Sequence, residues 1–129
     1  MNSVNLLLQS NPTWVEIKRR NKNRADIIAL LPVVDGKGAS RFNLVVRASQ
    51  KGGASVIEQA NQRQLPEFCL ERHINPDGTF CLYFGSDAKL VDADAAAIWW
   101  ASLSAFLTCC IDQLMQSVFL YVLTLALRH

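Results

Sequence analysis

The chain has 129 residues, of which 50% are hydrophobic and 19% charged, a composition typical of one compact globular domain. Six glycines and four prolines are too few for a collagen-like or low-complexity chain. A domain of this size buries roughly two thirds of its unfolded surface, so it needs neither disulfides nor a metal to fold. We therefore expect a single domain over residues 1–129.

The net charge of +2 hides a segregation along the chain. Between Glu16 and Lys51 there are nine Lys and Arg against three acids, whereas between Gly52 and Asp94 there are three against seven. The densest basic run, residues 18–24, has one aromatic neighbour, Trp14, and no RNA-binding signature. The pattern favours a solvated hairpin over phosphate binding, and no nucleic-acid partner is expected.

The N-terminal residues and the cysteines bear on the compartment. Residues 1–11 contain no basic n-region, and their apolar run is too short for a secretory signal, so a cytoplasmic protein is expected. The cysteines would then be free thiols. They are Cys69, Cys81, Cys109 and Cys110. Their spacing matches no zinc framework, so we expect neither a metal nor a cofactor.

The first half of the chain predicts a strand meander. Three segments of alternating or β-branched residues, Thr13–Arg20, Ala25–Val34 and Arg41–Ser49, are joined by turn-forming residues. In the third segment Phe42, Leu44 and Val46 alternate with Asn43, Val45 and Arg47. Three sequential strands so linked favour an antiparallel sheet. After this sheet we expect one short helix over Ala54–Gln62 and an extended piece over Leu65–Leu70.

The second half predicts a helical part over residues 92–127. Asp92 can cap the helix, and Trp99, Leu103, Phe106, Cys110 and Leu114 follow at helical spacing. Asp112 is the only charge between residues 95 and 127, and the two uncharged runs of seventeen and fifteen residues are shorter than the roughly twenty needed to span a membrane. Buried helices, with Cys109 and Cys110 in the core, are therefore favoured over a membrane protein. The last stretch is apolar on all sides and must dock, and a second copy of the chain is one candidate partner.

The most informative segment is residues 72–82. Residues 75–78, Asn-Pro-Asp-Gly, are a strong turn signal. Cys81 follows this turn closely, and His73 precedes Cys81 by eight positions. Taken alone, such a pair is more often a small core cysteine and a surface histidine than a catalytic pair.

The segment resembles the active-site segment of ubiquitin-conjugating enzymes, in which a thioester-forming Cys follows a stretch of the form Asn-Ile-Asn-x-x-Gly-x-Ile. The matching residues are Ile74, Asn75, Gly78, Phe80 in place of Ile, Cys81 and Leu82. It looks most like the prokaryotic relatives found in anti-phage gene clusters such as CBASS. These relatives carry a Trp-Trp helix after the cysteine segment, and Trp99-Trp100 matches it here.

The resemblance implies an α+β fold, an antiparallel β-meander packed against helices, with the cysteine loop over residues 71–91. It implies that Cys81 is the nucleophile and that Asn75 belongs to the catalytic motif. His73 stands where the family has its motif Asn, so it could donate a hydrogen bond to the oxyanion. Asp87 and Asp92 are the acids nearest the cysteine that could assist an acceptor amine. The chain departs from the family at Glu71-Arg72, in place of His-Pro, and at Tyr83, in place of Asp.

The implied function is an acyl carrier that holds the C-terminus of a partner protein as a thioester and transfers it to an acceptor. In the anti-phage relatives the carried protein is a cGAS-like nucleotidyltransferase. The activated acyl group would come from a separate adenylating enzyme or from a direct reaction. Two alternatives stay open: a non-catalytic binding module of the same fold, and a small membrane-associated protein built on residues 95–127.

Overall fold

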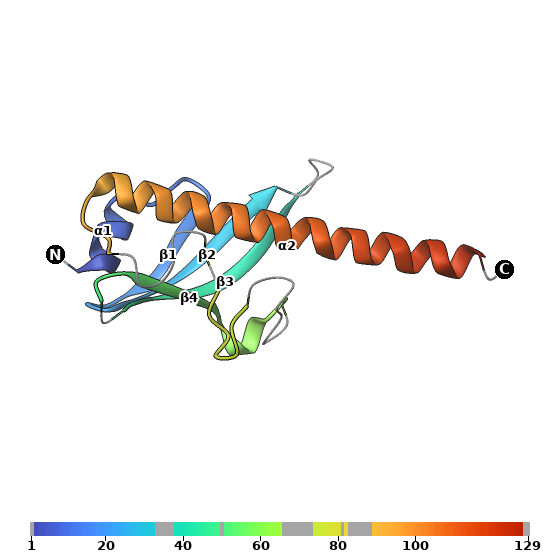
Figure 1. Ribbon diagram of the computed structural model, residues 1–129, viewed down its shortest axis with the longest axis horizontal. Helices are drawn as coiled ribbons and strands as arrows, with labels where there is room; N and C mark the ends of the chain where they lie inside the picture. Colours follow the sequence, from blue (N-terminus) through green and yellow to red (C-terminus); the bar gives the residue numbers. More distant parts are fainter. Residues whose placement is uncertain are drawn as a thin grey trace.

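The computed structural model describes residues 2–32, 38–49, 51–65, 74–80, 82 and 89–127, without the side chains of residues 39 and 112–123. The elements follow the chain in the order α1 (Ser3–Gln9), β1 (Val15–Arg20), β2 (Arg24–Pro32), β3 (Ala39–Ala48), β4 (Ala54–Glu58), η1 (Ala60–Gln62) and α2 (Ala93–Leu127). Figure 1 shows α2 lying across one face of the sheet, with α1 beside its N-terminal end.

The four strands form one antiparallel sheet in the order β1-β2-β3-β4. Successive strands are neighbours because each is joined to the next by a short connection, which is the arrangement that a meander predicts. Together with the two helices the sheet makes an α+β fold, as the sequence predicted. We call the side of the sheet covered by α2 the inner face and the opposite side the outer face.

The period of two in the strands assigns side chains to these faces. On the inner face the central strands place apolar residues that are almost wholly buried. They are Ala25, Ile27, Ala29, Leu31, Phe42, Leu44, Val46, Ala54 and Val56. Asp26, Asn43, Val45 and Arg47 alternate with them and face outwards. The alternation predicted for residues 42–47 is therefore confirmed.

Helix α2 begins where the sequence predicts. The Oδ1 atom of Asp92 accepts a hydrogen bond from the N–H of Ala95 at 2.8 Å, which caps the first turn. The two tryptophans of α2 are buried, and each indole N–H has a backbone acceptor: Trp99 donates to the carbonyl of Ala54 at 3.3 Å and Trp100 to that of Leu7 at 3.0 Å. The pair thus joins α2 to β4 and to α1.

The structure corrects two expectations and adds one helix that the sequence analysis does not predict. Residues 54–62 form a strand and a short 3-10 helix rather than one helix, because Val56 and Ile57 are β-branched and the segment pairs with β3. Helix α1 is the element that the sequence analysis does not predict; Asn2 caps it by accepting from the N–H of Asn5 at 2.9 Å. Cys110 is buried as expected, whereas Cys109 is exposed because it lies one position round the helix from the buried stripe.

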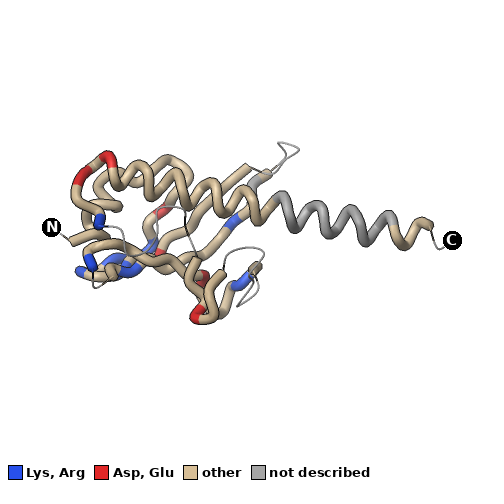
Figure 2. The backbone as a smooth tube through the Cα atoms, viewed as in Figure 1, with Lys and Arg blue, Asp and Glu red and all other residues tan. Residues whose placement is uncertain are grey.

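One helix in the described part of the chain, over Ala93–Ile111, is long and apolar enough to cross a membrane by length and composition. After its first turn this stretch carries no charged residue (Figure 2), and its Trp99, Leu103 and Leu107 are fully buried in the domain core. The core helix of a globular domain has the same composition, and we interpret this stretch as such a helix. Beyond it α2 continues past the sheet, and Leu125 and Leu127 near its end are exposed.

Candidate active site

The segment that precedes Cys81 folds into a tight hairpin. The N–H of Gly78 donates to the carbonyl of Asn75 at 2.8 Å, and the N–H of Asn75 donates to the carbonyl of Thr79 at 2.9 Å. An antiparallel bridge between Ile74 and Phe80 closes the two arms. The turn expected over residues 75–78 is therefore confirmed.

Side chains lock this turn from within. The Oδ1 atom of Asp77 accepts from the hydroxyl of Thr79 at 2.6 Å and from its N–H at 3.0 Å. The Nδ2 atom of Asn75 donates to the same hydroxyl at 3.0 Å. The hydrogen bond from the Thr79 hydroxyl lowers the pKa of the Asp77 carboxyl below its usual 3.8, and the hydrogen bond from the Thr79 N–H has a smaller effect in the same direction. Both hydrogen bonds favour the charged form. At neutral pH the turn is thus stabilised by an ionised aspartate.

Strand β4 holds the hairpin against the domain. The N–H of Phe80 donates to the carbonyl of Val56 at 2.9 Å, and the Phe80 ring stacks on that of Phe106 of α2 with ring centroids 4.5 Å apart. Phe80 and Leu82, the two neighbours of position 81, are both buried. The backbone on each side of the predicted nucleophile is therefore anchored in the core.

Gly78 makes the close approach to β4 possible. Its φ is +87°, a conformation that L side chains rarely adopt. A Cβ atom at this position would lie 2.9 Å from Cδ1 of Ile57 and 3.8 Å from Nη2 of Arg63. The turn therefore packs against the side chain of Ile57, which faces outwards from β4.

A buried carboxylate anchors the neighbouring segment. Glu58, at the end of β4, is 4% exposed. Its two carboxylate oxygens accept from the N–H groups of Gln64 and Leu65, each at 2.9 Å. Burial raises the pKa of Glu58 above its usual 4.5, although these hydrogen bonds and the charge of Arg63 act in the opposite direction. Strand β4 thus fixes both the hairpin and residues 64–65.

Of the four predicted site residues the structure describes one. Asn75 is exposed, and its side chain is part of the turn network. Cys81, His73 and Asp87 lie outside the described residues, and their roles stay predictions. Sequence reasoning missed Glu58. A signal for it exists, because Glu58 shares strand parity with the inward residues Ala54 and Val56.

Most of the chain matches a known protein family. The model of the family described as prokaryotic E2 domain (E2-ntca) matches residues 15–116. The chain belongs to this family. The match runs from β1 into α2 and includes the whole hairpin and Cys81. No curated protein matches the chain, and no solved structure matches it.

Membership of the prokaryotic E2 family confirms the general resemblance drawn from residues 72–82. It indicates a ubiquitin-conjugating-like transferase that acts on a protein partner. The four-stranded antiparallel sheet with α2 across one face is consistent with an E2-like domain.

Proposed function

We propose that Cys81 carries the C-terminal acyl group of a partner protein as a thioester and passes it to an acceptor nucleophile. Membership of the prokaryotic E2 family carries this proposal. The Gly-x-Phe-Cys-Leu pattern at residues 78–82, which stands where ubiquitin-conjugating enzymes have their thioester cysteine, supports it.

The reaction consists of two acyl transfers, one to Cys81 and one from Cys81 to the acceptor. In the first, the Cys81 thiolate attacks an activated acyl group supplied by an adenylating enzyme, so that a C–S bond forms and the activating group leaves. In the second, an acceptor amine attacks the thioester carbonyl, an amide bond forms and the thiol is regenerated. A free thiol with a pKa near 8.5 is a few per cent ionised at neutral pH, which suffices against an already activated acyl group.

The described geometry is suited to such a nucleophile. Transfer between two large proteins requires the sulfur to be held at a defined place, because much of the rate advantage comes from orientation. The hydrogen bond of Phe80 to Val56, the stacking of Phe80 on Phe106 and the burial of Leu82 fix the chain before and after residue 81.

The other predicted residues have roles within the same proposal. An imidazole N–H from His73 would stabilise the charge that develops on the acyl oxygen, and one such donor typically contributes about 10²–10³ in rate. Asp87 would assist deprotonation of the acceptor amine. The resemblance to anti-phage relatives makes a cGAS-like nucleotidyltransferase the expected carried protein and defence in the cytoplasm the expected setting.

The test expresses four proteins in the native host, each purified and weighed intact: the unaltered chain, Cys81→Ser, Cys81→Ala and Cys109→Ser. Serine traps the acyl group as an ester that cleaves more slowly than a thioester. We expect a protein-sized mass increment on Cys81→Ser that survives reducing agent and is missing from Cys81→Ala. The size of the increment identifies the carried protein.

Cys109→Ser is the matched control, because Cys109 is an exposed cysteine of α2. This variant should keep the thiol-sensitive adduct of the unaltered chain. An increment of the same size on Cys81→Ala would contradict the proposal. Absence of any adduct from all four proteins would instead favour the non-catalytic binding module.

A further inference from the structure

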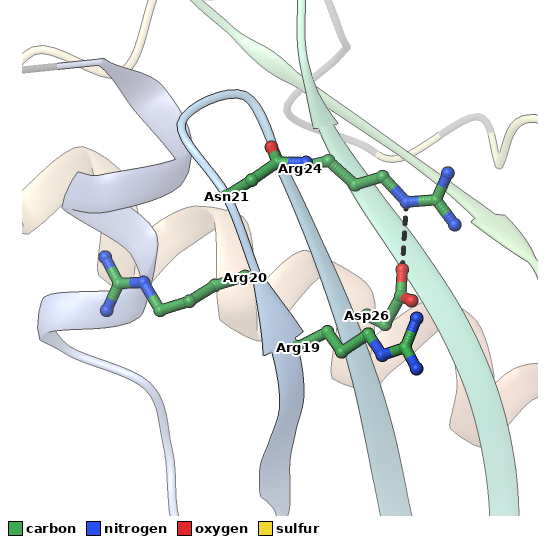
Figure 3. Close-up of a pocket in the computed structure, with 5 residues that line it drawn as sticks. All are labelled: Arg19, Arg20, Asn21, Arg24 and Asp26. Carbon is green, nitrogen blue, oxygen red and sulfur yellow. Dashed lines mark hydrogen bonds and ion pairs between the residues drawn. The ribbon is translucent and has the colours of Figure 1, made fainter.

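The outer face of the sheet carries a groove that the proposed reaction does not use. Two adjoining depressions share Arg24 and Asp26. The first extends to Arg19 at the β1–β2 hairpin (Figure 3), and the second extends across β3 and β4 to Arg47 and Arg63. We call these five residues and the surface between them the arginine groove.

The guanidinium groups in the first depression are not equivalent. Figure 3 shows Arg19 and Arg24 on the same side of the strands as Asp26, whereas Arg20 points away towards α1. There Arg20 donates from Nη2 to Oδ1 of Asn5 at 2.9 Å. The register between β1 and β2 shifts between Ile17 and Arg19, which brings Arg19 opposite Asp26 and Arg20 opposite Ala25. Because side chains alternate along a strand, Arg19 and Arg20 point to opposite faces. Arg20 therefore already has a partner within the domain, Asn5, and we do not count it as part of the arginine groove.

Positive charge in the arginine groove is only partly balanced. Arg24 donates from Nε to Asp26 at 3.0 Å. The charge of Arg63 acts on the buried Glu58, which also lines the second depression. No described carboxylate lies within ion-pair distance of Arg19 or Arg47. In the β2–β3 register Arg24 stands directly opposite Arg47. Like charges directly opposite on neighbouring strands are destabilising. An anionic partner in the groove would remove this repulsion.

The composition of the groove favours a protein partner over a nucleic acid. All of its cationic residues are arginines, which are enriched at protein interfaces, whereas lysines are depleted there. Its floor includes the apolar side chains of Val45 and Ile57. No Trp, Tyr or Phe is among the described residues that line it, so it offers no platform on which bases would stack.

We propose that the arginine groove docks an acidic segment of a partner protein. The groove ends at Ile57 and Arg63, beside Gly78 of the hairpin that precedes Cys81. A partner bound there is held next to the segment that bears the predicted nucleophile. Docking requires no thioester, but its use in presenting a substrate or acceptor rests on the proposed function.

The test measures binding of a labelled peptide of about twelve residues, half of them glutamate, by fluorescence anisotropy at several salt concentrations. The comparison peptide has glutamine in place of every glutamate, and a single-stranded DNA of equal length is measured in parallel. The double variant Arg19→Ala/Arg47→Ala removes two exposed cations and leaves the Arg24–Asp26 pair intact. Lys51→Ala/Lys89→Ala is the matched control, because these exposed lysines line a different depression.

We expect the glutamate peptide to bind, with an affinity that falls as salt rises, and the glutamine peptide not to bind. The arginine variant should weaken binding by about tenfold or more and the lysine variant by less than about twofold, as expected for residues that contribute directly to an interface. Absence of binding, or equal losses in both variants, would overturn the proposal. Tighter, arginine-dependent binding of the DNA would overturn it in favour of a nucleic-acid surface. None of these outcomes depends on adduct formation at Cys81.

Discussion

The two faces of the sheet are built from the same strands but carry different side chains, apolar on the inner face and partly charged on the outer face. The inner face holds Phe42, Leu44 and Val46 under α2, and its residues are almost wholly buried. The outer face holds Arg24 and Arg47, which line the arginine groove. The inner face therefore provides most of the stability, and the outer face provides the surface for the docking that we propose. The hairpin at residues 74–80 touches both, because Phe80 packs in the core and Gly78 rests on Ile57.

The largest effect should come from the inner face. Trp99 is fully buried, and its indole N–H bonds to Ala54. Trp99→Ala should lower the free energy of unfolding by about 3–5 kcal/mol, since it removes a large core side chain and leaves a cavity. Urea unfolding followed by circular dichroism measures the loss.

Ile98, next to Trp99 in sequence, provides the comparison because it is 49% exposed. Ile98→Ala should change the unfolding free energy by less than about 0.5 kcal/mol. Equal losses for the two variants would contradict the division between a buried and an exposed side of α2.

The next largest effect should come from Glu58. Glu58→Ala leaves two backbone N–H groups, those of Gln64 and Leu65, without their carboxylate acceptor. We expect a loss of about 1–3 kcal/mol in the free energy of unfolding. Glu58→Gln retains one acceptor oxygen and should lose less. A loss from Glu58→Gln as large as that from Glu58→Ala would show that these hydrogen bonds do not carry the effect.

Glu58 also gives a pH dependence with a defined sign. Burial raises the pKa of Glu58 in the folded state above its usual 4.5. As pH rises through this window the unfolded chain loses the proton first, so the folded state binds more protons and the free energy of unfolding falls. The unaltered chain should therefore lose stability relative to Glu58→Gln between pH 4.5 and the raised pKa. A relative gain over that window would refute the assignment.

The last effect should come from the hairpin. Gly78→Ala places a Cβ in a left-handed conformation, which costs about 1–2 kcal/mol, and 2.9 Å from Cδ1 of Ile57. Adding Ile57→Val removes that methyl group, so the double variant should recover the part of the loss that is due to the clash. Chemical unfolding of both variants measures the recovery. If the double variant recovers no stability, the whole loss is due to the backbone conformation and not to the clash with Ile57.

The sequence predicts the meander, the start of α2 and the turn at residues 75–78, because each has a local signature: alternation, a capping aspartate and an Asn-Pro-Asp-Gly run. It does not predict β4, since Ala54 and Glu58 favour helices and only pairing with β3 makes the segment a strand. Helix α1 is similarly set by tertiary contact, through the bond from Trp100 to Leu7.

In the candidate site, too, the local motif is predictable from the sequence and the long-range contacts are not. The motif at residues 74–82 is visible in the sequence, as are Cys81 and Asn75 within it. The anchoring of Leu65 by Glu58 and the contact of Gly78 with Ile57 join positions that are seven and twenty-one residues apart. No local pattern encodes such contacts, because they depend on how the strands pair and pack.

Tandem mass spectrometry of Cys81→Ser, purified from the native host under reducing conditions, locates the acyl group on the chain. We expect a peptide spanning residue 81 whose serine is esterified by the C-terminal residues of a second protein, and no modification at Cys109. A partner acyl group attached at Cys109 or at a lysine, with residue 81 unmodified, would contradict the proposed function.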